Sequence, residues 1–152
     1  MVAHGVEFAP RATALPFGDY MLDGSNISID TKQDVQEVAG NIGRDHARFV
    51  RECDRARAEG YRLVILVEEH PEFNDRSKLQ RWTSYVCRRC RRCNPFEVGS
   101  RCVKYRNKPM NGRTVARIIG TLEKEHGVRF EFCYKRDTAR RICEILGVPY
   151  DG

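Results

Sequence analysis

The sequence predicts an α/β fold with a mixed central sheet flanked by helices, on the basis of three patterns. Residues 63–67 form a continuous apolar run after Gly60, as expected of a strand that is covered on both faces. Residues 128–134 alternate between apolar and other side chains, as in a strand with unequal faces nearer a sheet edge. Elsewhere, apolar side chains recur three or four positions apart, which is typical of amphipathic helices.

The predicted elements follow in a simple order. Two short apolar runs, 13–22 and 27–32, flank a cluster of turn formers and predict a β-hairpin. A helix with a basic face is expected over 43–59, before the central strand. Two later helices are expected over 112–127, ending at its final glycine, and over 139–146. The order is therefore hairpin, helix, strand, helix, strand and helix.

A long connection with little regular structure is expected over residues 70–111. This stretch lacks clear periodicity and is interrupted by three prolines. One helix is expected near 79–86. Trp82 and Tyr85 lie three positions apart, and we expect both to anchor that helix to the core rather than to stack on nucleic-acid bases.

Length and composition fit a single domain. The chain has 152 residues, of which 41% are hydrophobic, and can bury roughly two-thirds of its unfolded surface around one core. We expect a cytoplasmic protein without a membrane partner, because no apolar run approaches the roughly 18 residues of a membrane span and the amino terminus lacks a secretory signal. The formal net charge of +6 fits either a nucleic-acid partner or a solvated basic face.

Two carboxylates and a lysine are the candidate catalytic groups. Asp19 lies in the first run of the hairpin, and Asp30 and Lys32 lie in the second. Side chains at i and i+2 of a strand share a face, so Asp30 and Lys32 emerge together, and the hairpin brings Asp19 toward them. Carboxylates hold Mg²⁺ or Mn²⁺, and a metal beside an ammonium activates water and stabilises charge on a phosphate. The pattern predicts a metal-dependent phosphodiesterase.

Each of these residues also has a structural alternative. Asp19 follows Gly18 and fits a turn, whereas the segment 30–32 fits a polar strand end that begins a helix, where Asp is a common cap. A D-x-K pattern is frequent by chance. The choice between the two explanations therefore depends on the rest of the chain.

From about residue 15 to 146 the chain resembles the XPF-type, excision-repair branch of the PD-(D/E)XK nucleases. Gly18-Asp19-Tyr20 matches the G-D-Y/F element of that branch, and Asp30-Thr31-Lys32 occupies the place of its E-R-K. Three further segments follow in the order of the family, namely its R-F…R helix at residues 46–49 with Arg55, its strand ending in V-E at 64–68, and the strand before its last helix at 127–132.

The resemblance implies a restriction-endonuclease-like core and structure-specific cleavage of branched or flapped DNA, in DNA repair or recombination. It implies that Asp19 and Asp30 bind the metal, that Lys32 serves in catalysis, and that Arg48 and Arg55 position the DNA strand. Glu68 is a further, less favoured candidate metal ligand. Because such nucleases work as dimers, a homodimer or a partner subunit of the nuclease family is also implied.

The chain departs from the family at three places. Family members begin with a strand carrying D-x-R-E, which nothing in the first eight residues supplies. Asp30 and Thr31 replace a glutamate and an arginine. The family has an aspartate a few residues after the lysine, and the candidates for that position here are Asp34, Gln36 and Glu37. These departures leave a second hypothesis, in which the chain is a catalytically inactive nuclease-like module that binds DNA or mediates dimerisation.

Seven cysteines in a chain without a secretion signal argue against disulfides. Three lie within apolar patterning and are expected in the core as small hydrophobes: Cys53, Cys133 and Cys143. The other four form a C-x2-C-x2-C run and a later thiol among arginines: Cys87, Cys90, Cys93 and Cys102.

These four clustered thiols have three explanations. They fit a tetrahedral Zn²⁺ site, an iron–sulfur site or free thiols, and the spacing matches neither kind of metal site closely. The zinc explanation gives a third functional hypothesis, a zinc-bearing DNA-binding protein. In every case the neighbouring arginines are expected to contact a phosphate backbone, namely Arg88, Arg89, Arg91 and Arg92.

Overall fold

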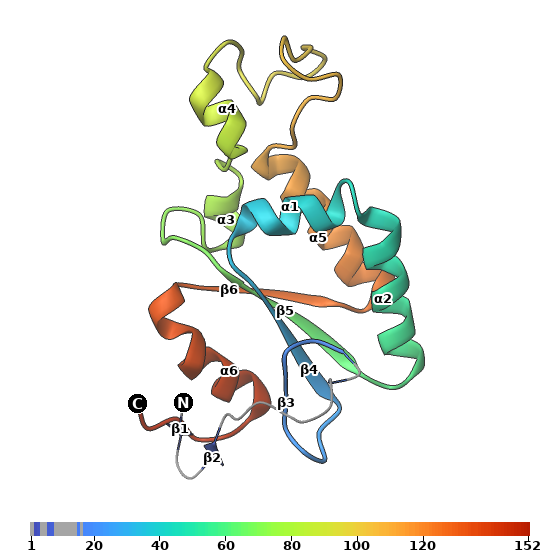
Figure 1. Ribbon diagram of the computed structural model, residues 1–152, viewed down its shortest axis with the longest axis vertical. Coiled ribbons are helices and arrows are strands. Elements are labelled where there is room, and N and C mark those ends of the chain that lie inside the picture. Colours follow the sequence, from blue (N-terminus) through green and yellow to red (C-terminus); the bar gives the residue numbers. More distant parts are fainter. Residues whose placement is uncertain (1, 4–5, 8–14, 16) are drawn as a thin grey trace.

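The structure is a computed structural model that describes residues 2–3, 6–7, 15 and 17–152. It confirms an α/β fold with a four-stranded mixed sheet flanked by helices (Figure 1). β3 pairs antiparallel with β4, and β4, β5 and β6 are parallel. The sheet runs in the order β3 (Tyr20–Met21), β4 (Ile27–Lys32), β5 (Arg62–Glu68) and β6 (Arg129–Cys133). A separate antiparallel pair joins β1 (Val2–Ala3) and β2 (Val6–Glu7).

Helices cover both faces of the sheet because both faces of its central strands are apolar. One face packs against α1 (Val35–Ile42), α2 (His46–Ala58), α3 (Arg76–Leu79) and α5 (Gly112–His126). The other face packs against α6 (Thr138–Leu146), which follows a 3-10 turn, η1 (Lys135–Asp137). As predicted, β5 is central, β6 is at an edge, and the three expected core cysteines are buried.

Helix α1 is an element that we did not predict. Its buried residues Val35, Val38, Ala39 and Ile42 follow helical spacing, and Asp34 caps it by accepting a hydrogen bond from the Glu37 N–H at 2.8 Å. The expected hairpin is present but its first strand is only two residues long. Positions 13, 14 and 16 of the predicted run lie outside the described residues.

The helix expected near 79–86 was wrong. Two helices stand in its place, α3 and α4 (Tyr85–Cys90), because Thr83 forms a β-bridge with Asn111 between them. Trp82 is buried, as expected, whereas Tyr85 lies beyond the bridge and its side chain is 53% exposed. The two aromatic residues therefore belong to different elements, and only Trp82 anchors the core.

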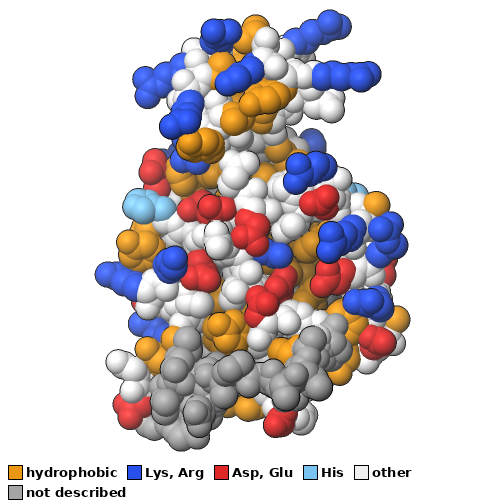
Figure 2. Space-filling model, viewed as in Figure 1, with side chains coloured by type: hydrophobic (Ala, Val, Ile, Leu, Met, Phe, Trp, Pro, Cys, Tyr) orange, Lys and Arg blue, Asp and Glu red, His pale blue; other side chains and the backbone are white. Residues whose placement is uncertain are grey.

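Residues 85–110, which we call the projecting segment, extend beyond the end of the sheet where α1 begins (Figure 1). The segment consists of α4 and irregular chain, and none of its residues is buried. Figure 2 shows that Lys and Arg side chains crowd this end of the molecule, while most acidic side chains on the same face lie over the body below. Within the described residues, no helix is long and apolar enough to cross a membrane.

Candidate active site

The register of the sheet decides where Asp30 and Lys32 point. In the parallel pairing of β4 with β5, Asp30 lies beside Ile65 and Lys32 beside Val67. Ile65 and Val67 belong to the larger core under α1 and α2, whereas Ile29 belongs to the core under α6. Because side chains alternate along a strand, Asp30 and Lys32 lie on the α1 and α2 side, near the carboxyl end of β4.

Asp19 is fixed against the same strand by hydrogen bonds of its backbone and of its carboxylate. Its N–H donates to the carbonyl of Ile29 at 2.7 Å, and its Oδ2 accepts from the N–H and the hydroxyl of Thr31 at 2.9 and 3.0 Å. The preceding Gly18 has a φ of 65°, and a Cβ there would lie 2.6 Å from Ser28 Oγ. Only glycine permits this close approach, so the Gly-Asp pair places the carboxylate.

The three candidate catalytic groups lie together. Lys32 Nζ is 3.1 Å from Asp30 Oδ2 and 3.8 Å from Glu37 Oε1. Burial raises the pKa of Asp30 to about 6; Lys32 acts against this rise, and the adjacent Asp19 carboxyl adds to it. Two carboxyl groups that repel each other at short range favour a bound proton or a bound cation between them.

A pocket of about 160 Å³ opens at Asp30 and Lys32, over a floor formed by Leu63 and Ile65. Arg48 lines its α2 wall, so this predicted arginine does belong to the site. The other wall residues were not predicted from the sequence: Asn41, Asp45, Phe49 and Glu52. The result is a mixed-charge pocket with an apolar floor.

Two of these residues stand out, one for its spacing in the sequence and the other for a buried oxygen. Glu52 follows Arg48 by four positions, a spacing that places both on one face of α2. Asn41 lies on α1, and its Oδ1 is buried without a hydrogen-bond partner among the described residues. A buried acceptor without a partner is costly, and a cation or its bound water would satisfy it.

Among the three candidates after the lysine, Glu37 lies at the site. It reaches Lys32, whereas the side chain of Asp34 is used as the cap of α1. Gln36 accepts a hydrogen bond from the first N–H of α4 at 3.0 Å and so ties the body to the projecting segment.

Two other expected residues lie elsewhere. The Arg55 guanidinium lies over the Phe17 ring, 5.0 Å from its centroid, and Arg55 is absent from the pocket wall that Arg48 forms. Glu68 Oε2 accepts a hydrogen bond from the Thr138 hydroxyl at 3.0 Å, on the side of α6. Glu68 is therefore engaged on the sheet face opposite to Asp30.

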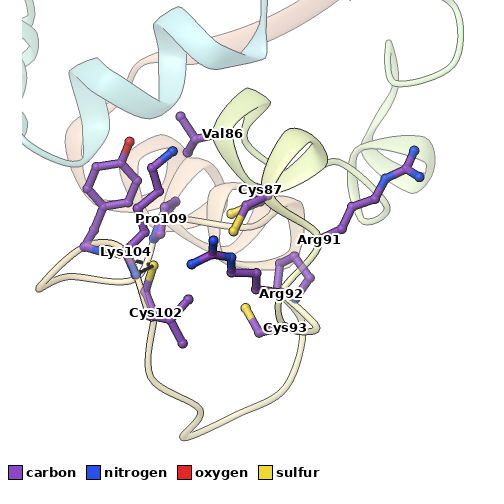
Figure 3. A pocket seen from close by; sticks show the side chains of 12 residues that line it. Val86, Cys87, Arg91, Arg92, Cys93, Cys102, Lys104 and Pro109 are labelled. Atoms are coloured by element: carbon purple, nitrogen blue, oxygen red, sulfur yellow. Dashed lines mark hydrogen bonds between the residues drawn. The ribbon is translucent and has the colours of Figure 1, made fainter.

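The projecting segment carries the other predicted groups. Burial raises the pKa of the Cys87 thiol, and the nearby Cys93, Cys102 and Cys90 add to the rise, so the other three thiols lie close to Cys87. They line one small pocket (Figure 3). The four predicted arginines of the segment are exposed and lie outside the carboxylate pocket: Arg88, Arg89, Arg91 and Arg92.

A groove of about 1230 Å³ connects the two regions. One wall belongs to the projecting segment and the other to α1 and α5, and the groove shares Asn41 and Asp45 with the carboxylate pocket. A ligand that entered the groove under the projecting segment would therefore reach the edge of the pocket that contains Asp30.

The ligand set of the carboxylate pocket suits a hard cation with several open positions. Within the described residues, no three His, Cys, Asp or Glu side chains are already grouped around one point. Mg²⁺ is commonly held by only one or two carboxylates together with water and substrate phosphate, so the pair formed by Asp19 and Asp30 fits it.

Comparison with known proteins gives no relative: no family model, no curated protein and no solved structure matches this chain.

Proposed function

We propose that this chain is a metal-dependent DNA endonuclease with a restriction-endonuclease-like core. The observation that carries the proposal is the convergence of three groups: Lys32 and Asp19 both contact Asp30, and Asp30 and Lys32 line one pocket. The resemblance of the chain to XPF-type nucleases extends the proposal to branched or flapped DNA as the substrate.

The metal would be held by oxygen atoms of Asp19 and Asp30. The unpartnered Asn41 Oδ1 in the wall of the same pocket supports this assignment, because it offers a further neutral oxygen for a water bound to the ion. When bound, Mg²⁺ or Mn²⁺ would neutralise charge on the phosphate and lower the pKa of a water molecule.

The protein groups would do the rest of the chemistry by position and charge. In hydrolysis, a water oxygen forms a new bond to phosphorus, the bond to the leaving sugar oxygen breaks, and that oxygen gains a proton. Lys32, whose side chain is 16% exposed, would orient the water or stabilise the negative charge that develops on the phosphate. Arg48 at the pocket wall would hold a neighbouring phosphate.

The DNA would reach this site through the groove beneath the projecting segment. The exposed arginines of that segment and the net charge of +6 favour contact with a phosphate backbone. The projecting segment contributes one acidic residue, Glu97, to the wall of the groove. That wall therefore repels a phosphate backbone only weakly.

The test is cleavage of a branched DNA with and without Mg²⁺. We expect wild-type protein to cut, and we expect Asp30→Asn and Lys32→Ala each to reduce the rate by at least roughly 100-fold while retaining DNA binding. Asp23→Asn, in the exposed hairpin turn, and Lys124→Ala, at an exposed position of α5, are matched controls that should cut normally. Equal rates in the site variants and their controls would refute the assignment.

A DNA-binding or dimerisation module without catalysis is the second candidate. The observation that favours it is that the described residues hold no group of three His, Cys, Asp or Glu side chains placed to share one metal ion. Binding of branched DNA by wild-type protein without Mg²⁺- or Mn²⁺-dependent cleavage would support the module over the enzyme. Sedimentation of the wild-type protein then distinguishes a dimer from a monomer.

A further inference from the structure

The projecting segment lacks the apolar core that holds the rest of the molecule. None of residues 85–110 is buried, and four of the five exposed large apolar residues in the described part of the chain lie there: Tyr85, Val98, Val103 and Tyr105. Irregular segments of this length need another source of order, such as a metal or a disulfide. Polar contacts join parts of the segment, such as the hydrogen bonds that Lys108 Nζ donates to Glu97 O and Ser100 Oγ.

The four cysteines of the segment are among its least exposed residues. Cys87, Cys90, Cys93 and Cys102 are half-buried, whereas the arginines between and beside them are exposed. Figure 3 shows Cys87, Cys93 and Cys102 around the same pocket, with Cys87 on α4 and the other two on irregular chain. The four cysteines thus line one pocket, which Arg91, Arg92 and Lys104 also line.

We propose that the projecting segment binds one structural Zn²⁺ ion through its four cysteines, Cys87, Cys90, Cys93 and Cys102. The proposal does not depend on nuclease activity. Four thiolates in tetrahedral array form a closed structural zinc site, and each thiol that becomes a ligand releases its proton to solvent.

The backbone around two of the cysteines is already shaped for a sulfur ligand. Cys102 Sγ accepts hydrogen bonds from the N–H groups of Lys104 and Tyr105 at 3.4 and 3.2 Å. A thiol sulfur is a weak acceptor, so two amides directed at one sulfur suit a thiolate, and such outer contacts orient metal ligands. Arg91, between Cys90 and Cys93, has a φ of 53° and is the one described non-glycine residue with positive φ, which reverses the chain after α4.

The size of the pocket and its charge favour a single ion. The pocket between the sulfurs has a volume of about 20 Å³, room for roughly one water-sized sphere, which is too small for an iron–sulfur cluster. A zinc tetrathiolate carries two negative charges, and the segment supplies cations to offset them: Arg88, Arg89, Arg91, Arg92, Arg101, Lys104, Arg106 and Lys108. The described residues hold no group of three sulfurs already arranged around one point, so binding requires side-chain rotation.

Metal analysis of the full chain tests the proposal. We expect about one zinc per chain after purification from zinc-supplemented cells, and near none in variants that change two of the four cysteines, such as C87S/C90S and C93S/C102S. The control is Cys143→Ala, a buried cysteine on α6, which should retain its zinc. Zinc content that is equal in all these proteins, or zinc-free wild-type protein that takes up no added Zn²⁺, would overturn the proposal.

Two readouts remain useful if a variant folds poorly. Adding Co²⁺ to the chelator-treated wild-type protein should give the visible absorption of a tetrahedral thiolate site, whereas iron with broad absorption in the protein as purified would indicate a cluster and refute zinc. Removing zinc should also accelerate tryptic cleavage within residues 85–110 by on the order of tenfold, with little change elsewhere. An unchanged cleavage pattern would show that zinc does not order the segment.

Discussion

The pocket at Asp30 and the projecting segment are two charged regions that are built in opposite ways. Asp30 and Lys32 stand on a strand whose neighbours Leu63 and Ile65 are at most 4% exposed, so the packing of the core fixes their positions. The projecting segment has no buried residue, and all its arginines are exposed. The difference indicates that one region is ordered by the hydrophobic effect and the other by its polar and sulfur groups.

The largest expected difference is in stability. Leu66→Ala removes a fully buried side chain from the sheet and should lower the free energy of unfolding by about 2–5 kcal/mol. Val103→Ala in the projecting segment, where the side chain is 64% exposed, should change it by less than about 0.5 kcal/mol. Urea unfolding followed by circular dichroism measures both. A cost above about 1 kcal/mol for Val103→Ala would mean that the segment has an apolar core after all.

Gly18→Ala should damage the carboxylate pocket more than a matched glycine change elsewhere in the hairpin. A Cβ at Gly18 would lie 2.6 Å from Ser28 Oγ and 2.7 Å from the Ile29 carbonyl, so the strand must shift and Asp19 with it. We expect a loss of about 2–3 kcal/mol in stability and a large loss of Mg²⁺-dependent cleavage.

Gly24→Ala is the control for this change. Gly24 also has positive φ, at 84°, but a Cβ there meets nothing within 4 Å. Its cost should be only the backbone term of about 1 kcal/mol, with normal cleavage. If both alanine variants cut equally well, the close packing at Gly18 does not position Asp19.

Sequence patterns predicted the parts of the molecule that depend on local spacing. Strand alternation along β4 predicted that Asp30 and Lys32 share a face, and the hairpin predicted that Asp19 lies beside them, as the structure places them. The apolar run predicted β5 as the central strand. These features follow from backbone periodicity, which is readable in a single sequence.

The remaining parts depend on packing between segments that are distant in sequence. Asn41 joins the pocket only because α1 packs beside α2, and α1 itself was not predicted. Glu52 has a helical spacing to Arg48, but which exposed face of α2 turns toward β4 is decided by the core. A distant contact also removed an element that periodicity predicted. The β-bridge between Thr83 and Asn111 divides the expected helix near 79–86, and Tyr85 therefore lies outside the core.

The raised pKa of Asp30 makes the stability of the protein depend on pH through this pocket. Since burial raises this pKa from 3.8 to about 6, ionisation of Asp30 costs stability as pH rises through that window. The full shift corresponds to about 3 kcal/mol, and partial exposure of the carboxyl reduces our expectation to about 1 kcal/mol.

Urea unfolding of wild-type protein and Asp30→Asn at pH 4 and pH 7.5 tests this effect. Asp30→Asn should gain about 1 kcal/mol relative to wild type between the two values, because the amide cannot ionise. Mg²⁺ affinity of the wild-type protein, measured by calorimetry, should fall as pH drops below about 6. A stability difference that does not vary with pH would show that Asp30 ionises freely in the folded protein.

The smallest expected effects come from single arginines, and they decide whether the two regions act on one DNA molecule. In an Asp30→Asn background, which binds without cutting, Arg48→Ala and Arg89→Ala should each weaken DNA binding by about threefold to fivefold and lower the salt slope by about one. Arg140→Ala, on α6 across the sheet, is the control and should change neither quantity. An effect of Arg48→Ala alone would confine the DNA to the pocket. Effects of both would show that one DNA molecule contacts both regions. The projecting segment would then contribute binding contacts, and the sheet would fix the geometry that catalysis requires.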